Sequence, residues 1–241
     1  MTTTTSRVRN IVRCAATAVM LLGAAGTSVA GELSGDIAPK LSGAALVKEL
    51  QKGGYVIYFR HGTTAEVGEK DVAEKDMDDC ARQRPLSDAG QAQTKEIGAA
   101  FRVLQIPIGA VYSSPYCRCL DTARNIFGKA PSKEKALHFA IQLRTAERAM
   151  VTARLLNMLG TVPAAGTNTG LVSHTENLQE AVGVWPKPEG VAHVFKPRGD
   201  GTFTYVGVMQ PEMWSAEAKH ASDAAQASGG GAGWLDWLRK R

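Results

Sequence analysis

The chain of 241 residues has few aromatic side chains, 6% of the total, and only four cysteines. It also lacks a basic run outside its last three residues, although lysine and arginine exceed the acidic residues by five. A nucleic-acid-binding surface normally shows clustered basic residues, so the composition argues against a nucleic-acid partner. The apolar run Ala15–Ala25 is shorter than the roughly 20 residues that a membrane-spanning helix needs.

The first 30 residues have the layout of a secretory signal peptide. Three arginines precede the apolar run, and small residues follow it at Ser28 and Ala30. We expect cleavage after Ala30, which leaves a periplasmic or secreted chain of 211 residues with a formal charge of +2. An uncleaved N-terminal anchor is the alternative. Because Cys14 precedes the apolar run and no cysteine follows it closely, we expect no lipoprotein.

Helical and strand patterns alternate along the rest of the chain. We expect helices at 45–53, 86–104, 115–128, 145–159 and 175–183, and strands at 55–59, 109–114, 135–143, 169–174, 191–195 and 202–208. The last two strands form a hairpin. This order predicts one layered α/β domain over residues 31–220 with a mixed sheet. Residues 221–241 read as a flexible tail of small residues that ends in WLDWLRKR, a segment that could dock on the domain or touch an anionic surface.

The most apolar strand, in GGYVIYFRHGTT, runs directly into Arg60, His61 and Gly62. An apolar strand bounded by glycines is typical of the middle of an α/β sheet, where both faces are covered. Ligands bind such sheets at the carboxyl ends of the strands. Arg60 and His61 are therefore placed where a site is built, although a solvated strand end is the simpler alternative.

A second arginine and a second histidine follow two further strands. In VYSSPYCRCLDTA, Ser114 can cap a helix and Pro115 can take its first position, which places Arg118 in the first turn. Helix N-termini attract anions, and arginine binds phosphate oxygens in a fork. His174 ends the strand in TGLVSHTENL. Three strand ends thus bring together two arginines and two histidines.

FRHGTT, SSPYCRCLDTA and LVSHTENL, in this order and spacing, resemble the histidine phosphatase superfamily, in the branch that includes phosphoglycerate mutases. RPLSDAGQAQ is similar to the LTxxGxxQ stretch of that branch, and the likeness extends from about Leu46 to Met209. The spacer after Gly62 and the signal look like secreted bacterial members. The resemblance implies a three-layer α/β/α sandwich with a mixed, mostly parallel central sheet, and a phosphohistidine intermediate.

The resemblance also implies roles for the site residues. His61 matches the nucleophile, Arg60 and Arg118 match the phosphate-binding arginines, and His174 matches the second histidine, which also binds phosphate. Thr64 is a further candidate for phosphate binding. An unprotonated imidazole nitrogen can attack phosphorus while guanidinium groups stabilise the charge on the oxygens. Neither a metal nor another cofactor is implied.

A carboxylic acid is needed to protonate a poor leaving group. We rank Glu189 first, because PEGVAHVF resembles the PTGIP stretch of the mutases with Glu189 in place of threonine. Glu147 ranks second, two residues beyond Thr145, which stands where many members carry the acid. In another set of members the acid directly follows the second histidine, and this chain has Thr175 there.

Together these features predict a metal-independent phosphomonoesterase, a histidine acid phosphatase type of enzyme, acting on a small phosphorylated substrate. We expect the segment 63–84 to select among phosphate esters. One alternative is a phosphotransferase similar to phosphoglycerate mutase. The other is a phosphate-binding module of the envelope without turnover.

Signal cleavage leaves three cysteines, Cys80, Cys117 and Cys119, in a compartment where disulfides persist. On a helical projection Cys119 falls within the apolar arc and Cys117 falls on the polar side. We therefore expect a disulfide between Cys80 and Cys117, with Cys119 buried and outside it. A zinc site is the alternative, but the three cysteines lack the usual paired spacing.

Overall fold

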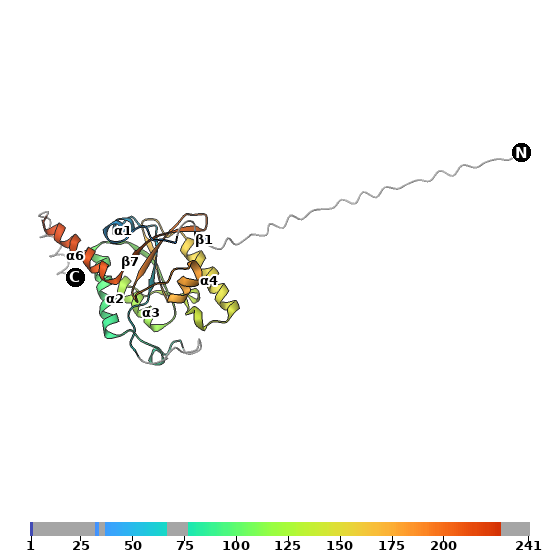
Figure 1. Cartoon of the computed structure of the whole chain (residues 1–241), viewed down its shortest axis with the longest axis horizontal. Coiled ribbons are helices and arrows are strands. Elements are labelled where there is room, and N and C mark those ends of the chain that lie inside the picture. Colours follow the sequence, from blue (N-terminus) through green and yellow to red (C-terminus); the bar gives the residue numbers. More distant parts are fainter. Residues whose placement is uncertain (2–31, 34–36, 67–76, 228–241) are drawn as a thin grey trace.

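The structure, a computed structural model, describes residues 1, 32–33, 37–66 and 77–227 (Figure 1). The expected signal peptide, its cleavage site after Ala30 and the terminal segment WLDWLRKR lie outside the described residues. Among the described helices, none is long and apolar enough to cross a membrane.

A mixed sheet forms the centre of the domain, with helices on both of its faces (Figure 1). The strand order in the described part of the chain is β1-β7-β6-β2-β5-β3-β4. The strands are β1 (Glu32–Leu33), β2 (Val56–Arg60), β3 (Ile108–Ser113), β4 (Ser132–Lys133), β5 (Asn168–Ser173), β6 (Ala192–Pro197) and β7 (Thr202–Met209). Strands β2, β5, β3 and β4 are parallel, whereas β6 is antiparallel to β2 and β7. The predicted α/β/α fold with a mixed, mostly parallel sheet is confirmed, and so is the hairpin.

Six helices occur in the described residues: α1 (Gly43–Leu50), α2 (Asp88–Val103), α3 (Cys117–Phe127), α4 (Thr145–Gly160), α5 (Thr175–Val182) and α6 (Pro211–Ala227). Strand β2 shows how they form two layers. Ile57 and Phe59 pack in the core that α1, α2, α3 and α6 cover, whereas Val56 and Tyr58 pack in the core under α4 and α5. Burial of both faces explains why β2 is apolar at successive positions rather than at alternate ones.

The predicted strand 135–143 is wrong. This segment instead forms two short 3₁₀ turns, η3 (Lys135–Leu137) and η4 (Ala140–Gln142). Its backbone is bonded by a side chain rather than by a neighbouring strand, because Asn177 Nδ2 donates to the carbonyl of His138 and Asn177 Oδ1 accepts from the amide of Ala140. A short apolar run does not by itself distinguish a strand from helical turns.

The C-terminal part of the domain also differs from the prediction. Helix α6 was not expected from the pattern, and it continues to Ala227, into the segment that we expect to be a flexible tail. Its Trp214 is fully buried and lies near Phe59 and Phe101. Helix α6 therefore belongs to the same layer as α1, α2 and α3, which covers one face of the sheet.

The predicted disulfide is confirmed. Cys80 and Cys117 are bonded, with their Cα atoms 5.7 Å apart, and Cys119 is buried and outside the bond. The buried side chain of Gln83 strengthens the same connection: its Oε1 accepts from the amide of Cys117 and its Nε2 donates to the carbonyl of Met77. The residues around η2 (Cys80–Arg82) are thus fixed to the start of α3.

We predict that replacing both Cys80 and Cys117 with serine lowers the free energy of unfolding by about 2 to 4 kcal/mol. The bond joins two residues that are 37 positions apart, and it therefore restricts the unfolded chain. Urea unfolding of the two proteins measures the difference. Dithiothreitol should lower the stability of the wild type and leave the double variant unchanged. Equal stability of wild type and double variant in the absence of reductant would contradict the prediction.

Candidate active site

The central residues of the site lie at the ends of two parallel strands. Strand β2 ends at Arg60 and its neighbour β5 ends at Ser173, which is paired with Arg60 in the register. His61 and His174 follow these strand ends, and their ring centroids lie 5.4 Å apart. The hydroxyl of the buried Tyr58 donates to the carbonyl of His174, which fixes the backbone at the second strand end.

The ring of His61 is held in one orientation. The ring is only 3% exposed, and its Nδ1 lies 2.9 Å from the carbonyl oxygen of Gly62. Because a carbonyl oxygen can only accept, Nδ1 carries the hydrogen, and Nε2 of the neutral ring keeps its lone pair. Burial, and then the positive charges of Arg118, Arg60 and Arg84, hold the pKa of His61 well below its usual 6.5.

Arg118 lies in the first turn of α3 and is completely buried. Its guanidinium lies over the ring of Tyr116, 4.6 Å from the centroid, and its Nη2 donates to Nδ1 of His174 at 3.2 Å. Tyr116, not Ser114, is the N-cap, so the predicted cap is wrong. The hydroxyl of Ser114 contacts Nε2 of His174 at 2.9 Å and accepts a longer bond, 3.5 Å, from the amide of Tyr116.

Arg118 and His174 together form a buried pair. Since a guanidinium can only donate, Nδ1 of His174 accepts and Nε2 carries the hydrogen of the neutral ring. Burial, followed by the charge of Arg118 and then the neighbouring rings of His61 and His138, holds the pKa of His174 well below its usual value. Both ring nitrogens of His174 are engaged by protein groups here, and Cys119 Sγ also lies 3.6 Å from Nε2.

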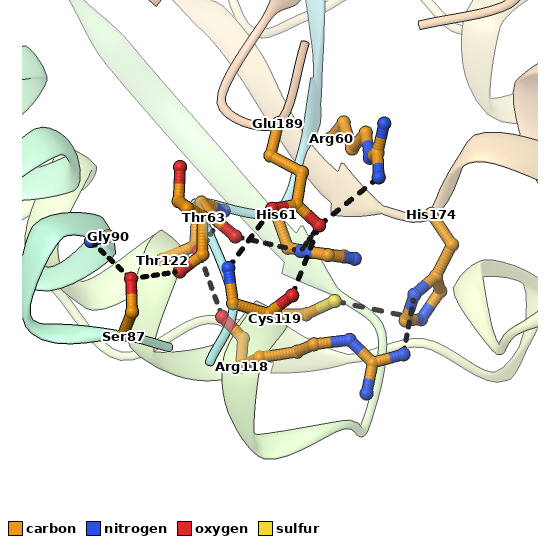
Figure 2. A network of polar contacts seen from close by, with 12 residues as sticks. Arg60, His61, Thr63, Ser87, Gly90, Arg118, Cys119, Thr122, His174 and Glu189 are labelled. Carbon is orange, nitrogen blue, oxygen red and sulfur yellow. Dashed lines mark hydrogen bonds and ion pairs between the residues drawn. The ribbon is translucent and has the colours of Figure 1, made fainter. Parts of the chain in front are cut away.

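The turn after His61 is fixed by helices α2 and α3. The amide of Gly62 donates to the hydroxyl of Thr122, and this hydroxyl donates to the carbonyl of Arg118. A Cβ atom on Gly62 would lie 2.5 Å from the side chain of Thr94. The glycine is therefore required by close packing against α2, and the turn brings Arg118 and His61 to one place (Figure 2).

Glu189 lies beside His61, as Figure 2 shows. Its Oε1 is 3.9 Å from His61 Nδ1 and 3.1 Å from Arg60 Nη2. The carboxylate also accepts from the amide and the hydroxyl of Thr64 at 3.0 and 3.2 Å. Thr64 therefore contacts the candidate acid in this structure, whereas the sequence suggests it as a phosphate ligand.

Glu147 lies elsewhere. It is in the first turn of α4, where its carboxylate accepts from the side chain and the amide of Arg144. The hydrogen bonds and charge of Arg144 lower the pKa of Glu147. The structure thus places Glu189 next to His61 and gives Glu147 a capping contact on the helix surface.

Arg84 is a further candidate for the site, one that the sequence patterns do not indicate. Its positive charge contributes to the lowered pKa of both His61 and His174. Its Nε is buried and has no hydrogen-bond partner among the described residues, and the same holds for Nε of Arg60. These N–H groups suit an oxyanion. The sequence feature that points to Arg84 is its position at the start of RPLSDAGQAQ, four residues after the disulfide-bonded Cys80.

The arrangement combines two neutral imidazoles, three guanidinium groups and one carboxyl group. Such a set can bind a tetrahedral dianion, attack it with the nitrogen lone pair, and exchange a proton with a leaving oxygen. Among the described residues, no group of three His, Cys, Asp or Glu side chains is placed to hold a metal ion.

One family model matches part of the chain. The model of the histidine phosphatase superfamily (branch 1) matches residues 56–139, a span that includes His61, Arg84 and Arg118 but not His174 or Glu189. Among solved structures, the chain is similar to the protein histidine phosphatase SixA complexed with tungstate, at 18% identity over 65% of this chain and 97% of that chain, with a TM-score of 0.47.

Two further structures are similar at the same level. A phosphoserine phosphatase mutant from Entamoeba histolytica, in complex with phosphoserine, shares 15% identity over 66% of this chain and 98% of that chain, with a TM-score of 0.45. Bacillus stearothermophilus YhfR shares 15% identity over 63% of this chain and 94% of that chain, with a TM-score of 0.48. No curated protein matches the chain.

We predict that Arg84→Gln raises the pKa of His61 and of His174, because it removes a positive charge that disfavours both imidazolium forms. Histidine C–H resonances followed by NMR against pH measure the shift. The variant should also bind inorganic phosphate about tenfold more weakly, the loss expected for one hydrogen bond to a charged group.

Arg124→Gln is the matched control, since Arg124 is exposed and paired with Asp121 on the outer side of α3. It should leave both the histidine titration and phosphate binding unchanged. Identical behaviour of the two variants would remove Arg84 from the site.

Proposed function

We propose that this chain is an exported phosphatase of the histidine phosphatase superfamily, which hydrolyses a phosphomonoester through a phosphohistidine on His61. The observation that carries the proposal is the state of His61. Its Nδ1 is committed to the carbonyl of Gly62, so that the unprotonated Nε2 is left as a nucleophile among arginine side chains. The disulfide between Cys80 and Cys117 supports export, because such bonds persist in oxidising compartments.

In the first step the phosphate dianion binds to the guanidinium groups of Arg60, Arg84 and Arg118. Nε2 of His61 attacks phosphorus as the bond from phosphorus to the ester oxygen breaks. The electron pair of that bond goes to the leaving oxygen, which takes a proton from the protonated carboxyl group of Glu189. The alcohol leaves, and the phosphoryl group remains on His61.

In the second step Glu189, now a carboxylate, accepts a proton from a water molecule that attacks the phosphoryl group. The bond from phosphorus to nitrogen breaks, its electron pair returns to Nε2, and inorganic phosphate is released. The lowered pKa of His61 keeps the ring neutral, so it leaves as a neutral imidazole and is ready for the next cycle.

The position of Glu189 favours catalysis over a binding module without turnover. Such a module needs no carboxyl group beside the nucleophile, yet Glu189 Oε1 lies 3.9 Å from Nδ1 of His61. A phosphotransferase would transfer the phosphoryl group to a second hydroxyl group instead of to water, so release of inorganic phosphate separates it from a hydrolase.

We predict that the mature protein, recovered from the periplasm with Gly31 at its N-terminus, releases phosphate from p-nitrophenyl phosphate, and that His61→Ala abolishes this activity. Rapid quenching of the wild type should trap an acid-labile phosphate on His61, identified by mass spectrometry. His220→Ala is the matched control, since His220 is exposed on α6. Label on another residue, or phosphate release by His61→Ala, would overturn the assignment.

We predict that Glu189→Gln slows the hydrolysis of an alkyl phosphate by roughly 10²- to 10⁴-fold, the usual contribution of a general acid. Hydrolysis of p-nitrophenyl phosphate should slow far less, because nitrophenolate leaves without protonation. Steady-state rates on the two substrates give the comparison. Glu147→Gln serves as the control and should change neither rate. Equal losses on both substrates would show that Glu189 does not act as the acid.

A further inference from the structure

We propose that Trp185 forms a subsite for the leaving group of the substrate, and that this group carries a ring with a flat face, either a sugar or an aromatic ring. This inference rests on the proposed function, because it concerns the alcohol that is released from phosphate. It places substrate selection in the loop 183–190, in addition to the segment 63–84.

The first observation is the direction in which the site opens. His61, His174 and Arg118 are 3%, 1% and 0% exposed, so they form its closed end. The side chains of Arg60 and Glu189 are 19% and 20% exposed, and they form the accessible rim. A bound phosphate at the closed end must therefore extend its ester oxygen toward this rim. The position of Glu189 agrees, since a general acid has to contact that oxygen.

The second observation is that the loop 183–190 carries both Glu189 and Trp185. The carbonyl of Pro186, the residue next to Trp185, accepts from Arg60 Nη1 at 3.2 Å. Consecutive Cα atoms are 3.8 Å apart, so the Cα atom of Trp185 lies within roughly 10 Å of this phosphate-binding group. That separation is within the reach of one sugar or aromatic ring attached to the phosphate.

The third observation is the exposure of the indole. Trp185 is the only exposed Phe, Trp or Tyr side chain among the described residues, at 49%. The ammonium group of Lys187 lies over this ring, 5.7 Å from its centroid, and places a donor at that face. Aromatic rings stack favourably on flat apolar faces, and the neighbouring cation suits a ring that bears oxygen substituents.

The loop is held firmly enough to act as a platform. Gly183 ends α5 in the left-handed conformation, and the amide of Gly190 donates to the carbonyl of His61 at 2.9 Å. Gln93 Nε2 donates to the carbonyl of Glu189. Proline at positions 186 and 188 restricts the backbone between these anchors. The backbone that carries Trp185 is therefore anchored on both sides to the elements around His61.

The test measures binding separately from turnover. In a His61→Ala background, calorimetry gives the Kd values of phenyl phosphate, glucose 1-phosphate and the acyclic glycerol 3-phosphate. We expect Trp185→Ala to weaken the ring phosphates by about three- to tenfold, the range expected for one aromatic contact, and to change glycerol 3-phosphate less than twofold. Trp185→Phe should restore most of the affinity. The ring ligand with the larger loss identifies the aromatic or the sugar class.

Val162→Ala is the matched control. Val162 is an exposed apolar residue that precedes β5, whereas His174 follows the other end of this strand. Equal weakening of cyclic and acyclic ligands would overturn the inference, because Trp185 would then act on the phosphate site through Pro186. Unchanged affinity for all three ligands would overturn it as well. If the loss of affinity depends on the ring but the wild type hydrolyses none of these esters, the subsite is supported and the proposed hydrolysis is refuted.

Discussion

The buried guanidinium of Arg118 is the constraint on which the rest of the site depends. A full charge without solvent exposure is costly unless other groups compensate it. Here the ring of Tyr116 lies over the guanidinium, and Nδ1 of His174 accepts from it. Burial, and then the same charge, disfavour a proton on His61 and on His174. The buried cation therefore suits an anion and helps to keep both imidazoles neutral.

The scaffold turns this local arrangement into a single rigid unit. The parallel pairing of β2 and β5 sets the two histidines at one edge of the sheet. Gln93 on α2 then joins two loops, because its Oε1 accepts from the amide of Thr63 and its Nε2 donates to the carbonyl of Glu189. The loop that follows His61 and the loop that carries Glu189 are thus fixed to the same helix. A reaction that uses both His61 and Glu189 would depend on this connection through Gln93.

The sequence was informative wherever a functional residue directly follows a regular element. Arg60, His61 and His174 stand at the ends of strands whose apolar pattern is unambiguous, and the structure brings them together. The pairing of Cys80 with Cys117 followed from the two sides of one helix.

Prediction failed where a long-range contact decides the local structure. Ser114 is a good cap by type, but its hydroxyl contacts His174, 60 residues away. The segment 135–143 has a strand-like composition, yet Asn177 bonds its backbone in two turns. Arg84 lies in an irregular segment whose course is set by the disulfide and by Gln83. None of these partners is visible in a local pattern.

The contact between Gln83 and the start of α3 bears on which groups are left to hold an anion at this site. The amide of Cys117, which helix geometry offers to an anion, is already bonded to Gln83. The anion is left to the long side chains of Arg60, Arg84 and Arg118. These side chains differ in how firmly they are held: Arg118 is completely buried against Tyr116 and His174, whereas the side chain of Arg60 is 19% exposed. An anion at this site would therefore meet one guanidinium that is fixed by packing and one that reaches the accessible side.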